Sequence, residues 1–448
     1  MYKRITSILA ACAVSLWSLS AQTVAVSLEE CLRMAQENDA AVRNSRLDLV
    51  AAREQLSEAR WEFMPRVSVS SFAYWSLNPL LKITVKDVLG NSDAANEINN
   101  RIQSFAQENG VKTSYSTLKD GFGASATVLQ PLYAGGRIVN GNRLAALGVE
   151  AAGLQSRIKE KGEAREIERK YWAVVALQEK MNTLLQAKAL LDTLSRDAQA
   201  ALAAGLMVDS DARAVRDRQN ELKAAEVKLR GGLRLSKMDL FNAIGYKYTV
   251  LGLDEMVLSD ELPELEAPSR YVREGGAGDE SALLSMQVRA KELEKKMAVG
   301  ESLPQLMVGA NYSYGNVTGN SHMRSNVVGF VALQIPITDL GKATHKARRM
   351  ETAIEKARND RDYLDSQLEL RRQMRQLEME TAWDSMMLAA EREDDARSDV
   401  SRAEANYRSG RSTLSDYLRA ELDLRTATEA LINAKIGYRN AVGEYLGE

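Results

Sequence analysis

The sequence is poor in residues on which several protein classes depend. Its 448 residues include only 2 cysteines, 2 histidines and 7 prolines. So few cysteines and histidines exclude a disulfide framework and a zinc site of the usual composition. The formal net charge of −2 at pH 7 lacks the basic surplus that nucleic-acid-binding domains usually show. We therefore expect no nucleic-acid partner, no metal and no cofactor.

A long hydrophobic run is also missing from the body of the chain. A membrane-spanning helix needs about 20 mostly apolar residues, and the mean hydropathy of this chain is −0.31. A helical membrane protein is therefore not expected. Neither His322 nor His345 stands in the spacing of a nucleophilic or metal site, so we predict that the protein is not an enzyme.

The first residues have the layout of a secretory signal peptide. Lys3 and Arg4 precede an apolar stretch, which ends in small residues near Ala21. We predict that residues 1–21 are cleaved and that the protein is exported. Cys12 ends a short lipoprotein-like box, and lipidation there is the alternative, although apolar sequence continues beyond it. Only Cys31 would remain after cleavage, so no intramolecular disulfide is expected.

The few prolines leave two long spans free. Proline breaks the interior of a helix, yet none occurs between Pro131 and Pro263 or after Pro336. At a rise of 1.5 Å per residue, a helix filling 137–203 would be about 100 Å long, much longer than an average globular helix. The spans predict long helices over 137–203, 206–245, 342–408 and 411–446.

The two halves of the chain repeat one pattern. Pro131, Gly136 and Gly205 in the first half correspond to Pro336, Gly341 and Gly410 in the second, each at an offset of 205 residues (336 minus 131, 410 minus 205). Such self-similarity indicates a tandem duplication of one unit. We expect a first repeat over 22–245, a linker or equatorial region over 246–280, and a second repeat over 281–448.

The predicted helices carry a coiled-coil pattern. In the last of them, large residues recur every seven positions from Tyr417 to Tyr445, and alanine follows most of them after three residues. Such alternation of large and small residues suits knobs-into-holes packing. The predicted fold class is mainly α with a small β part, in which long antiparallel helices pack as coiled coils.

Four segments alternate in polarity with period two, as strands with one apolar face do. They lie at about 66–78, 121–132, 305–315 and 327–337, and the fourth alternates poorly because it is apolar on both faces. Segments of about ten residues with aromatic ends are typical of transmembrane strands, although half-buried soluble strands give a similar pattern. An open sheet edge is not tolerated in lipid. If these strands span a membrane, several chains must therefore share one barrel.

A polar insert separates the strands of each pair. The longer one runs from about Asn78 to Asp120, and the shorter one from about Asn316 to Asn326. Asparagine, aspartate, lysine and serine dominate the longer insert, and such residues favour turns and loops. We predict that both inserts are extracellular loops.

Two duplicated features carry a resemblance to a known family. They are the segment Pro131-Leu132-Tyr133-Ala134-Gly135-Gly136-Arg137 with its copy after Pro336, and the two glycine turns with an aspartate downstream. In these features the mature chain resembles the TolC-like outer-membrane efflux proteins. The resemblance implies a homotrimer in the outer membrane of a Gram-negative cell. Each chain would give four strands to one twelve-stranded transmembrane β-barrel, while the helices would form a hollow α-barrel in the periplasm.

The resemblance also implies a function. The chain would be the outer-membrane exit duct of a tripartite efflux or type I secretion-like system. Such a duct passively conducts substrates that an inner-membrane transporter of the RND or ABC type delivers through a periplasmic adaptor. Taken alone, the residues also permit an exported periplasmic coiled-coil protein with a structural or interaction role.

The family's functional residues lie at the periplasmic tip. By resemblance, the adaptor-docking residues would be Gly205, Leu206 and Gly410. The gate would be formed by Asp211, Tyr407, Arg411, Asp416 and Arg419. This chain departs from its relatives at Arg419, where some carry a second acidic residue. We therefore expect a weaker acidic ring, with Arg419 paired to Asp416.

Overall fold

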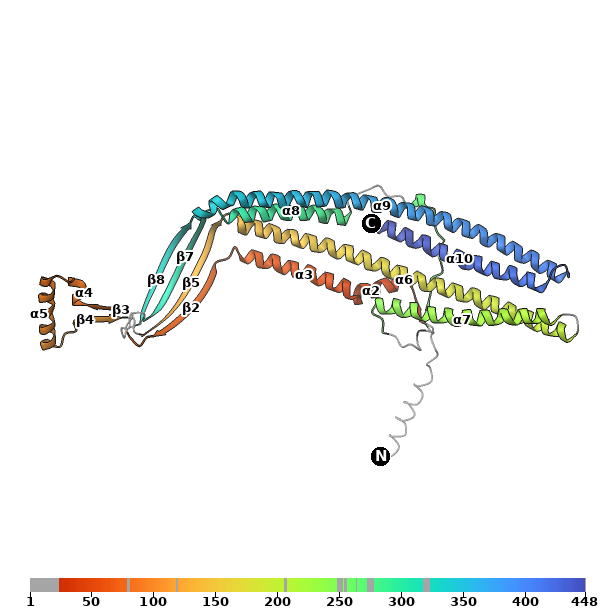
Figure 1. Cartoon of the computed structure of the whole chain (residues 1–448), viewed down its shortest axis with the longest axis horizontal. Helices are drawn as coiled ribbons and strands as arrows, with labels where there is room; N and C mark the ends of the chain where they lie inside the picture. The colour runs from red at the N-terminus through yellow and green to blue at the C-terminus, as the bar shows by residue number, and fades with distance from the viewer. Residues whose placement is uncertain are drawn as a thin grey trace, which may run out of the picture. The chain divides into compact units, whose positions relative to one another are not determined.

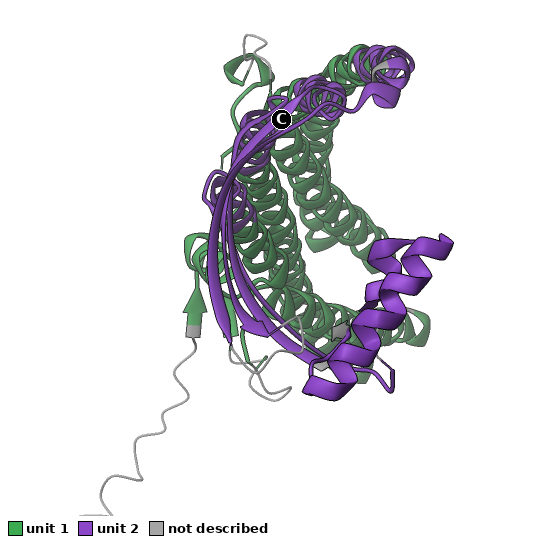
Figure 2. Ribbon diagram, turned by 90° about the vertical axis from the view of Figure 1, so that its left-hand side faces the viewer, with its two compact units in different colours: residues 1–51, 150–286, 359–448 green, residues 52–149, 287–358 purple. Residues whose placement is uncertain are grey.

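The structure, a computed structural model, describes residues 24–78, 81–117, 120–204, 208–247, 253, 256–262, 264–271, 278–316 and 323–447. The predicted signal peptide lies outside these residues. The chain forms two compact units, which Figure 2 shows in different colours. Unit 1 comprises residues 1–51, 150–286 and 359–448, and unit 2 comprises residues 52–149 and 287–358.

Two long helical hairpins dominate unit 1 (Figure 1). The first joins α6 (Arg137–Ala203) to α7 (Asp209–Ala243), and the second joins α9 (Ile337–Arg408) to α10 (Leu414–Leu446). Of the two longest helices, residues 150–203 and 359–408 belong to this unit. None of the helices in the described ranges combines the length and the apolarity that a membrane crossing requires.

The start of α9 differs from the sequence-based expectation. The helix begins at Ile337 and not at residue 342, because Pro336 directly precedes its first turn. Proline suits that position, since its missing N–H would have no partner within the helix. Helices α7 and α10 begin later than expected. α7 starts at Asp209 instead of 206, and α10 starts at Leu414 instead of 411.

Buried side chains hold the hairpins of unit 1 together. Leu184 of α6, Val215 of α7 and Tyr417 of α10 belong to one buried cluster. Tyr438 and Tyr445 pack with Met379 of α9 in another. Burying a large apolar side chain stabilises a fold by about 1.5–3 kcal/mol. The heptad positions of α10 therefore supply much of its packing energy.

A small parallel sheet fixes the first described residues of unit 1. β1 (Val24–Val26) pairs with β6 (Met256–Leu258), which lies in the region expected to be a linker. The carboxylate of Asp260 accepts hydrogen bonds from the backbone N–H of Leu28 and from the Tyr171 hydroxyl, both at 2.9 Å. Helix α2 (Leu28–Asn38) follows, with Ser27 as its N-cap. The pattern of the sequence did not predict this sheet.

Unit 2 contains one antiparallel four-stranded sheet. Its strands are β2 (Arg66–Trp75), β5 (Asp120–Ala134), β7 (Gln305–Asn316) and β8 (Arg324–Gln334), in the spatial order β2-β5-β7-β8. Helix α3 (Ala40–Trp61) precedes β2 along the chain, and α8 (Asp279–Gly300) precedes β7. β8 ends at Gln334 and not at 337, because α9 begins three residues later.

At the junction between β5 and α6 in unit 2, Gly135 lies against Gly300 of α8. Gly135 and Gly136 have φ of +62° and +74°, a conformation that other residues adopt at a cost. A Cβ atom on Gly135 would also collide with the carbonyl of Gly300, at the end of α8. Gly341, the repeat counterpart of Gly136, lies inside α9 with open space around it. The two copies of the motif therefore differ in structure.

The insert between β2 and β5 is not a simple loop. It contains β3 (Leu81–Thr84), α4 (Val85–Leu89), α5 (Asp93–Asn109) and β4 (Ser114–Thr117). β3 pairs with β4 in an antiparallel ladder. Ser92 caps the start of α5, and Gly110 ends it in the left-handed conformation. The insert predicted to be an extracellular loop therefore has regular secondary structure of its own.

Candidate functional site

The register of the sheet gathers apolar side chains on one face. Cross-strand partners in an antiparallel sheet point to the same side. One row across the four strands consists of Val69, Ala126, Tyr312 and Val327. The side chains of Val69, Tyr312 and Val327 are 77%, 48% and 70% exposed. This face therefore presents a continuous apolar surface that no described part of the chain covers at these positions.

Register also assigns the fourth strand, which the sequence pattern left undecided. Val331 pairs with Val308 and Leu333 pairs with Leu306, so both lie on the same face as Val327. Phe330 alternates with them and lies on the opposite face, where its ring covers Gly309. β8 can therefore carry apolar residues on both sides, although only one face of the sheet is continuously apolar.

The opposite face of the sheet carries rows of polar side chains beside exposed apolar ones such as Phe72 and Val328. One row across it consists of Ser70, Ser125, Ser313 and Asn326. The hydroxyls of Ser70 and Ser125 are 2.9 Å apart. In the adjacent row, the amide of Asn311 donates to the Thr127 hydroxyl at 2.7 Å. Side-chain ladders of this kind suit a water-facing surface, because exposed hydroxyls and amides can bond to solvent as well.

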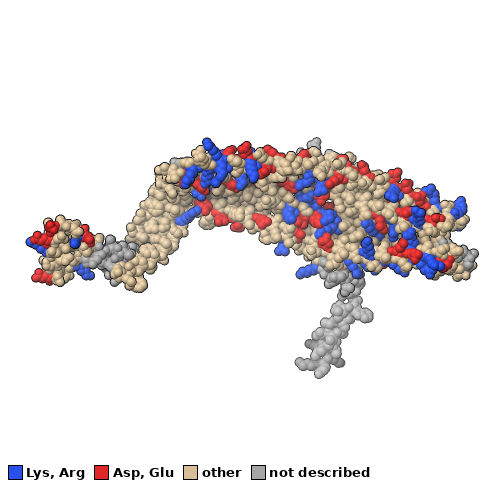
Figure 3. Space-filling view, viewed as in Figure 1, with Lys and Arg blue, Asp and Glu red and all other residues tan. Residues whose placement is uncertain are grey.

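Charged residues stand only at the ends of the strands. They are Arg66 in β2, Asp120 in β5 and Arg324 in β8, and Figure 3 shows the sheet as a surface without charge between the charged helices and the insert. Transmembrane strands are uncharged over about 9–11 residues and alternate between lipid and water. The sheet lacks charge over this length and alternates between apolar and polar side chains. Within the described residues, β2 and β8 each pair with one neighbour only.

The turn between α9 and α10 carries the second group of candidate residues. Gly410 has φ +72°, its N–H donates to the carbonyl of Tyr407 at 2.9 Å, and the N–H of Arg411 donates to that of Asn406 at 2.8 Å. These two bonds form the helix-ending motif that favours glycine. The guanidinium of Arg411 donates to the Ser409 hydroxyl at 3.0 Å. The turn is therefore built by its own residues and leaves Gly410 uncovered.

Asp416 has a structural partner in the same turn. Its carboxylate accepts hydrogen bonds from the Thr413 hydroxyl at 2.7 Å and from the Thr413 N–H at 3.0 Å, which completes a capping box at the start of α10. These bonds, followed by the charge of Arg419, hold the pKa of Asp416 below its usual value. Among the ion pairs of the described residues, none joins Arg419 to Asp416. Arg419 therefore affects Asp416 only by the longer-range attraction between their charges.

The structure describes the remaining candidates unevenly. Gly205 and Leu206 lie outside the described residues, and Asp211 belongs to the first turn of α7, where its side chain is not described. Tyr407 is described and lies against the second hairpin's own core. Its ring stacks on that of Tyr417, with centroids 6.0 Å apart.

A half-buried acid lies beside these two tyrosines. Glu421 lies one helical turn further along α10 than Tyr417, and the two side chains shift each other's pKa. Burial raises the pKa of Glu421, the contact with the Tyr417 hydroxyl lowers it, and the charge of Glu404 raises it, so that the net shift is upward. Tyr417 was identified from the sequence as a packing residue, but Glu421 was missed. A carboxylate four residues from a buried tyrosine is the only signal that could have pointed to it.

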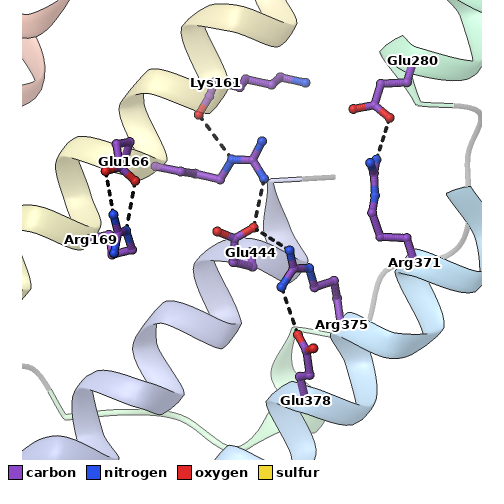
Figure 4. A network of polar contacts seen from close by, with 9 residues as sticks. Lys161, Glu166, Arg169, Glu280, Arg371, Arg375, Glu378 and Glu444 are labelled. Carbon is purple, nitrogen blue, oxygen red and sulfur yellow. Dashed lines mark hydrogen bonds and ion pairs between the residues drawn. The ribbon is translucent and has the colours of Figure 1, made fainter.

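A network of ion pairs joins the two repeats within unit 1 (Figure 4). Glu444 of α10 lies 3.6 Å from Arg165 of α6 and 3.4 Å from Arg375 of α9. Arg371 of α9 pairs with Glu280 at 2.6 Å. Exposed pairs contribute only about 0–1 kcal/mol each. The network therefore orients the helices more than it stabilises them.

The second half of the chain resembles a known protein family. Residues 283–443 match the model of the outer membrane efflux protein family. Most of the expected second repeat therefore resembles that family. Among curated protein sequences, none gives a significant match to the chain. The family consists of efflux proteins and not of enzymes, and the predicted outer-membrane location is confirmed by this match.

Solved structures of outer membrane proteins and channels share the fold of nearly the whole chain. The outer membrane protein VceC of Vibrio cholerae is 13% identical, with a TM-score of 0.71 over 94% of this chain and 96% of that one. The CmeC outer membrane channel of Campylobacter jejuni is 13% identical, with a TM-score of 0.70 over 94% of this chain and 84% of that one. The MtrE outer membrane channel of Neisseria gonorrhoeae is 13% identical, with a TM-score of 0.65 over 96% of this chain and 92% of that one. The resemblance to TolC-like proteins and the predicted fold class are therefore confirmed.

The raised pKa of Glu421 makes the stability of this protein depend on pH. Folding favours the protonated acid, so this group's contribution is complete below its ordinary pKa of 4.5 and is lost as the pH rises through the raised value. We expect Glu421→Gln to raise the midpoint of thermal unfolding at pH 7 and to leave it unchanged at pH 4. Asp423→Asn, at an exposed position of the same helix, is the control. An equal effect of Glu421→Gln at both pH values would show that the carboxyl is ionised in the folded protein.

Proposed function

We propose that the protein is the outer-membrane exit duct of a tripartite efflux or type I secretion-like system. The sheet of unit 2 is the observation that carries this proposal. It has one apolar exposed face, an opposite face with rows of polar side chains, and no charge between its strand ends. A surface of this kind fits a wall between lipid and water. The long helices then form the periplasmic part of the duct.

Three copies of the chain form the duct. The two open edges of the sheet support this proposal, because unpaired backbone groups are costly in lipid. Four strands from each of three chains close one twelve-stranded barrel. Residues of α9 support the same assembly, since Tyr363, Leu370 and Leu377 recur every seven positions and are exposed in the single chain. A neighbouring copy would cover this stripe in a helical barrel.

The hairpin turns are proposed to receive a periplasmic adaptor, which connects the duct to an inner-membrane transporter of the RND or ABC type. The turn at Gly410 supports this role because a side chain added there would meet no neighbour within 4 Å. Val208 supports it at the other turn, where it is an exposed apolar residue at the start of α7. Gly205 and Leu206 are assigned to the same docking tip.

The gate is proposed to lie at the same end of the hairpins. Its residues are Asp211, Tyr407, Arg411, Asp416 and Arg419. Tyr407 supports the proposal by its position, since it stands one turn before the open glycine turn and is only partly covered by Tyr417. In the trimer, the remaining face of Tyr407 is free to contact a neighbouring helix.

Loss of a closing contact should open this gate. We expect the double variant Tyr407→Phe, Asp211→Ala to have a higher single-channel conductance in planar bilayers than the wild type, because a hydroxyl and a carboxylate that can bond across the tip are both removed. Tyr246→Phe is the control, because Tyr246 packs on Phe241 and is assigned neither to the tip nor to the contact between copies. Equal conductance of the double variant and the wild type would remove both residues from the gate.

Docking can be tested at Gly410 without disturbing the helices. A residue other than glycine in the left-handed conformation costs about 1–2 kcal/mol, and asparagine tolerates it best. We expect Gly410→Arg to abolish efflux while the protein still fractionates with the outer membrane as a three-chain complex in detergent. Gly410→Asn should keep both efflux and the complex, which separates docking from backbone strain.

Two outcomes would contradict the proposal. Loss of the three-chain complex in Gly410→Arg would show that the glycine is needed for assembly only. A wild-type protein that is soluble in the periplasm and monomeric without detergent would instead support an exported coiled-coil protein with a structural role.

A further inference from the structure

The insert between β2 and β5 exposes apolar residues that its own fold does not cover. Of its 37 residues (81–117), only Ala95, Asn99 and Ala106 are buried among the described side chains. Seven larger apolar side chains are exposed: Ile83, Val88, Leu89, Ile98, Ile102, Phe105 and Val111. The insert therefore has almost no hydrophobic core of its own.

A unit of this size needs another source of stability. Domains below about 40 residues usually depend on disulfides, metals or association, and a two-stranded sheet alone is marginal in water. The insert contains neither cysteine nor histidine. Association is therefore the remaining source, and the question is which partner covers the exposed side chains.

The exposed residues of α5 form a coiled-coil seam. Ile98, Ile102 and Phe105 are separated by four and three residues, which places them on one face of the helix. Ile98 is 48% exposed and Phe105 is 65% exposed. Isoleucine at successive seam positions of parallel helices favours bundles of three or four strands over dimers. The seam therefore suits a partner helix of the same kind.

The charge of the insert points to the same partner. Four basic residues (Lys82, Lys86, Arg101, Lys112) balance four acidic ones (Asp87, Asp93, Glu97, Glu108). A surface with no net charge gives no preference for anionic lipid headgroups or for a strongly charged protein. It also allows identical copies to approach one another without repulsion.

We propose that the α5 helices of three copies pack together through Ile98, Ile102 and Phe105. The inference rests on the proposed trimer, in which connectivity places three inserts at the same end of the shared barrel, beyond the strand ends that carry Asp120 and Arg324. The partner is a second and third copy of this chain. The resulting three-helix cluster ties the outer ends of the chains together.

Cysteine cross-linking in intact cells tests this contact. Ile98→Cys should give covalent dimers under a mild oxidant, with at most two of the three chains of each trimer linked. Asn100→Cys is the matched control, because it is exposed on the same helix but lies about 200° around it from Ile98. Cys31 is fully buried and should contribute no background.

A second variant guards against misfolding of the insert. In intact cells, external trypsin should leave the wild-type insert uncut at Arg101 and Lys112. It should cleave the insert of the Ile98→Glu, Phe105→Glu variant, because a charged seam cannot pack.

The outcomes separate this inference from the proposed function. A three-chain complex in detergent without an Ile98→Cys dimer, or with equal linkage at position 100, would overturn the helix cluster and leave the duct standing. Trypsin cleavage of the wild-type insert in that complex would overturn it as well. Absence of the three-chain complex would overturn both.

Discussion

Backbone hydrogen bonding at the edges of one sheet is the constraint on which the account depends. An unpaired N–H or C=O costs several kcal/mol in hydrocarbon (about 2–7 by transfer measurements). β2 and β8 each have one strand partner in the described chain. If the apolar face of the sheet lies in lipid, the edge of β2 must pair with the β8 edge of another copy. Assembly is then a condition for membrane insertion and not a later addition to it.

The duplication of the chain supplies the strands of this sheet. The two repeats differ at the junction between their last strand and the long helix that follows. Each repeat supplies two strands and continues into a long hairpin. In the first repeat, Gly135 lets the backbone pass against Gly300 at the base of the sheet. In the second, α9 starts directly after Pro336 without such a turn. Identical spacing in sequence therefore does not imply identical junctions, because a helix start and a glycine turn can occupy the same interval.

Features set by local sequence could be predicted, whereas features set by distant neighbours could not. The bounds of α6 agree with the proline-free span and its glycines, since helix ends depend on nearby residues. The two faces of β8 could not be predicted, because Val327 and Val328 are equally apolar and only the pairing with β7 distinguishes them. At the candidate tip, Gly410 was visible as a turn, but the stacking of Tyr407 on Tyr417 depends on how two helices pack. The pair of Arg439 with Glu168, 271 residues apart, leaves no trace in the sequence pattern. Helix α5 did have local sequence signals, the N-cap Ser92 and the C-cap Gly110. The polar composition of the insert nevertheless led to the prediction of a loop.

The orientation of β8 is the most direct test of the account. Single cysteines at Val327, Val328, Phe330 and Val331 can be labelled in outer membranes with a fluorophore and exposed to lipid-soluble or water-soluble quenchers. Because the register sets the faces, labels at Val327 and Val331 should be quenched from the lipid phase, and labels at Val328 and Phe330 from water. Quenching of all four positions from water alone, or with no alternation, would contradict a sheet that separates lipid from an aqueous channel.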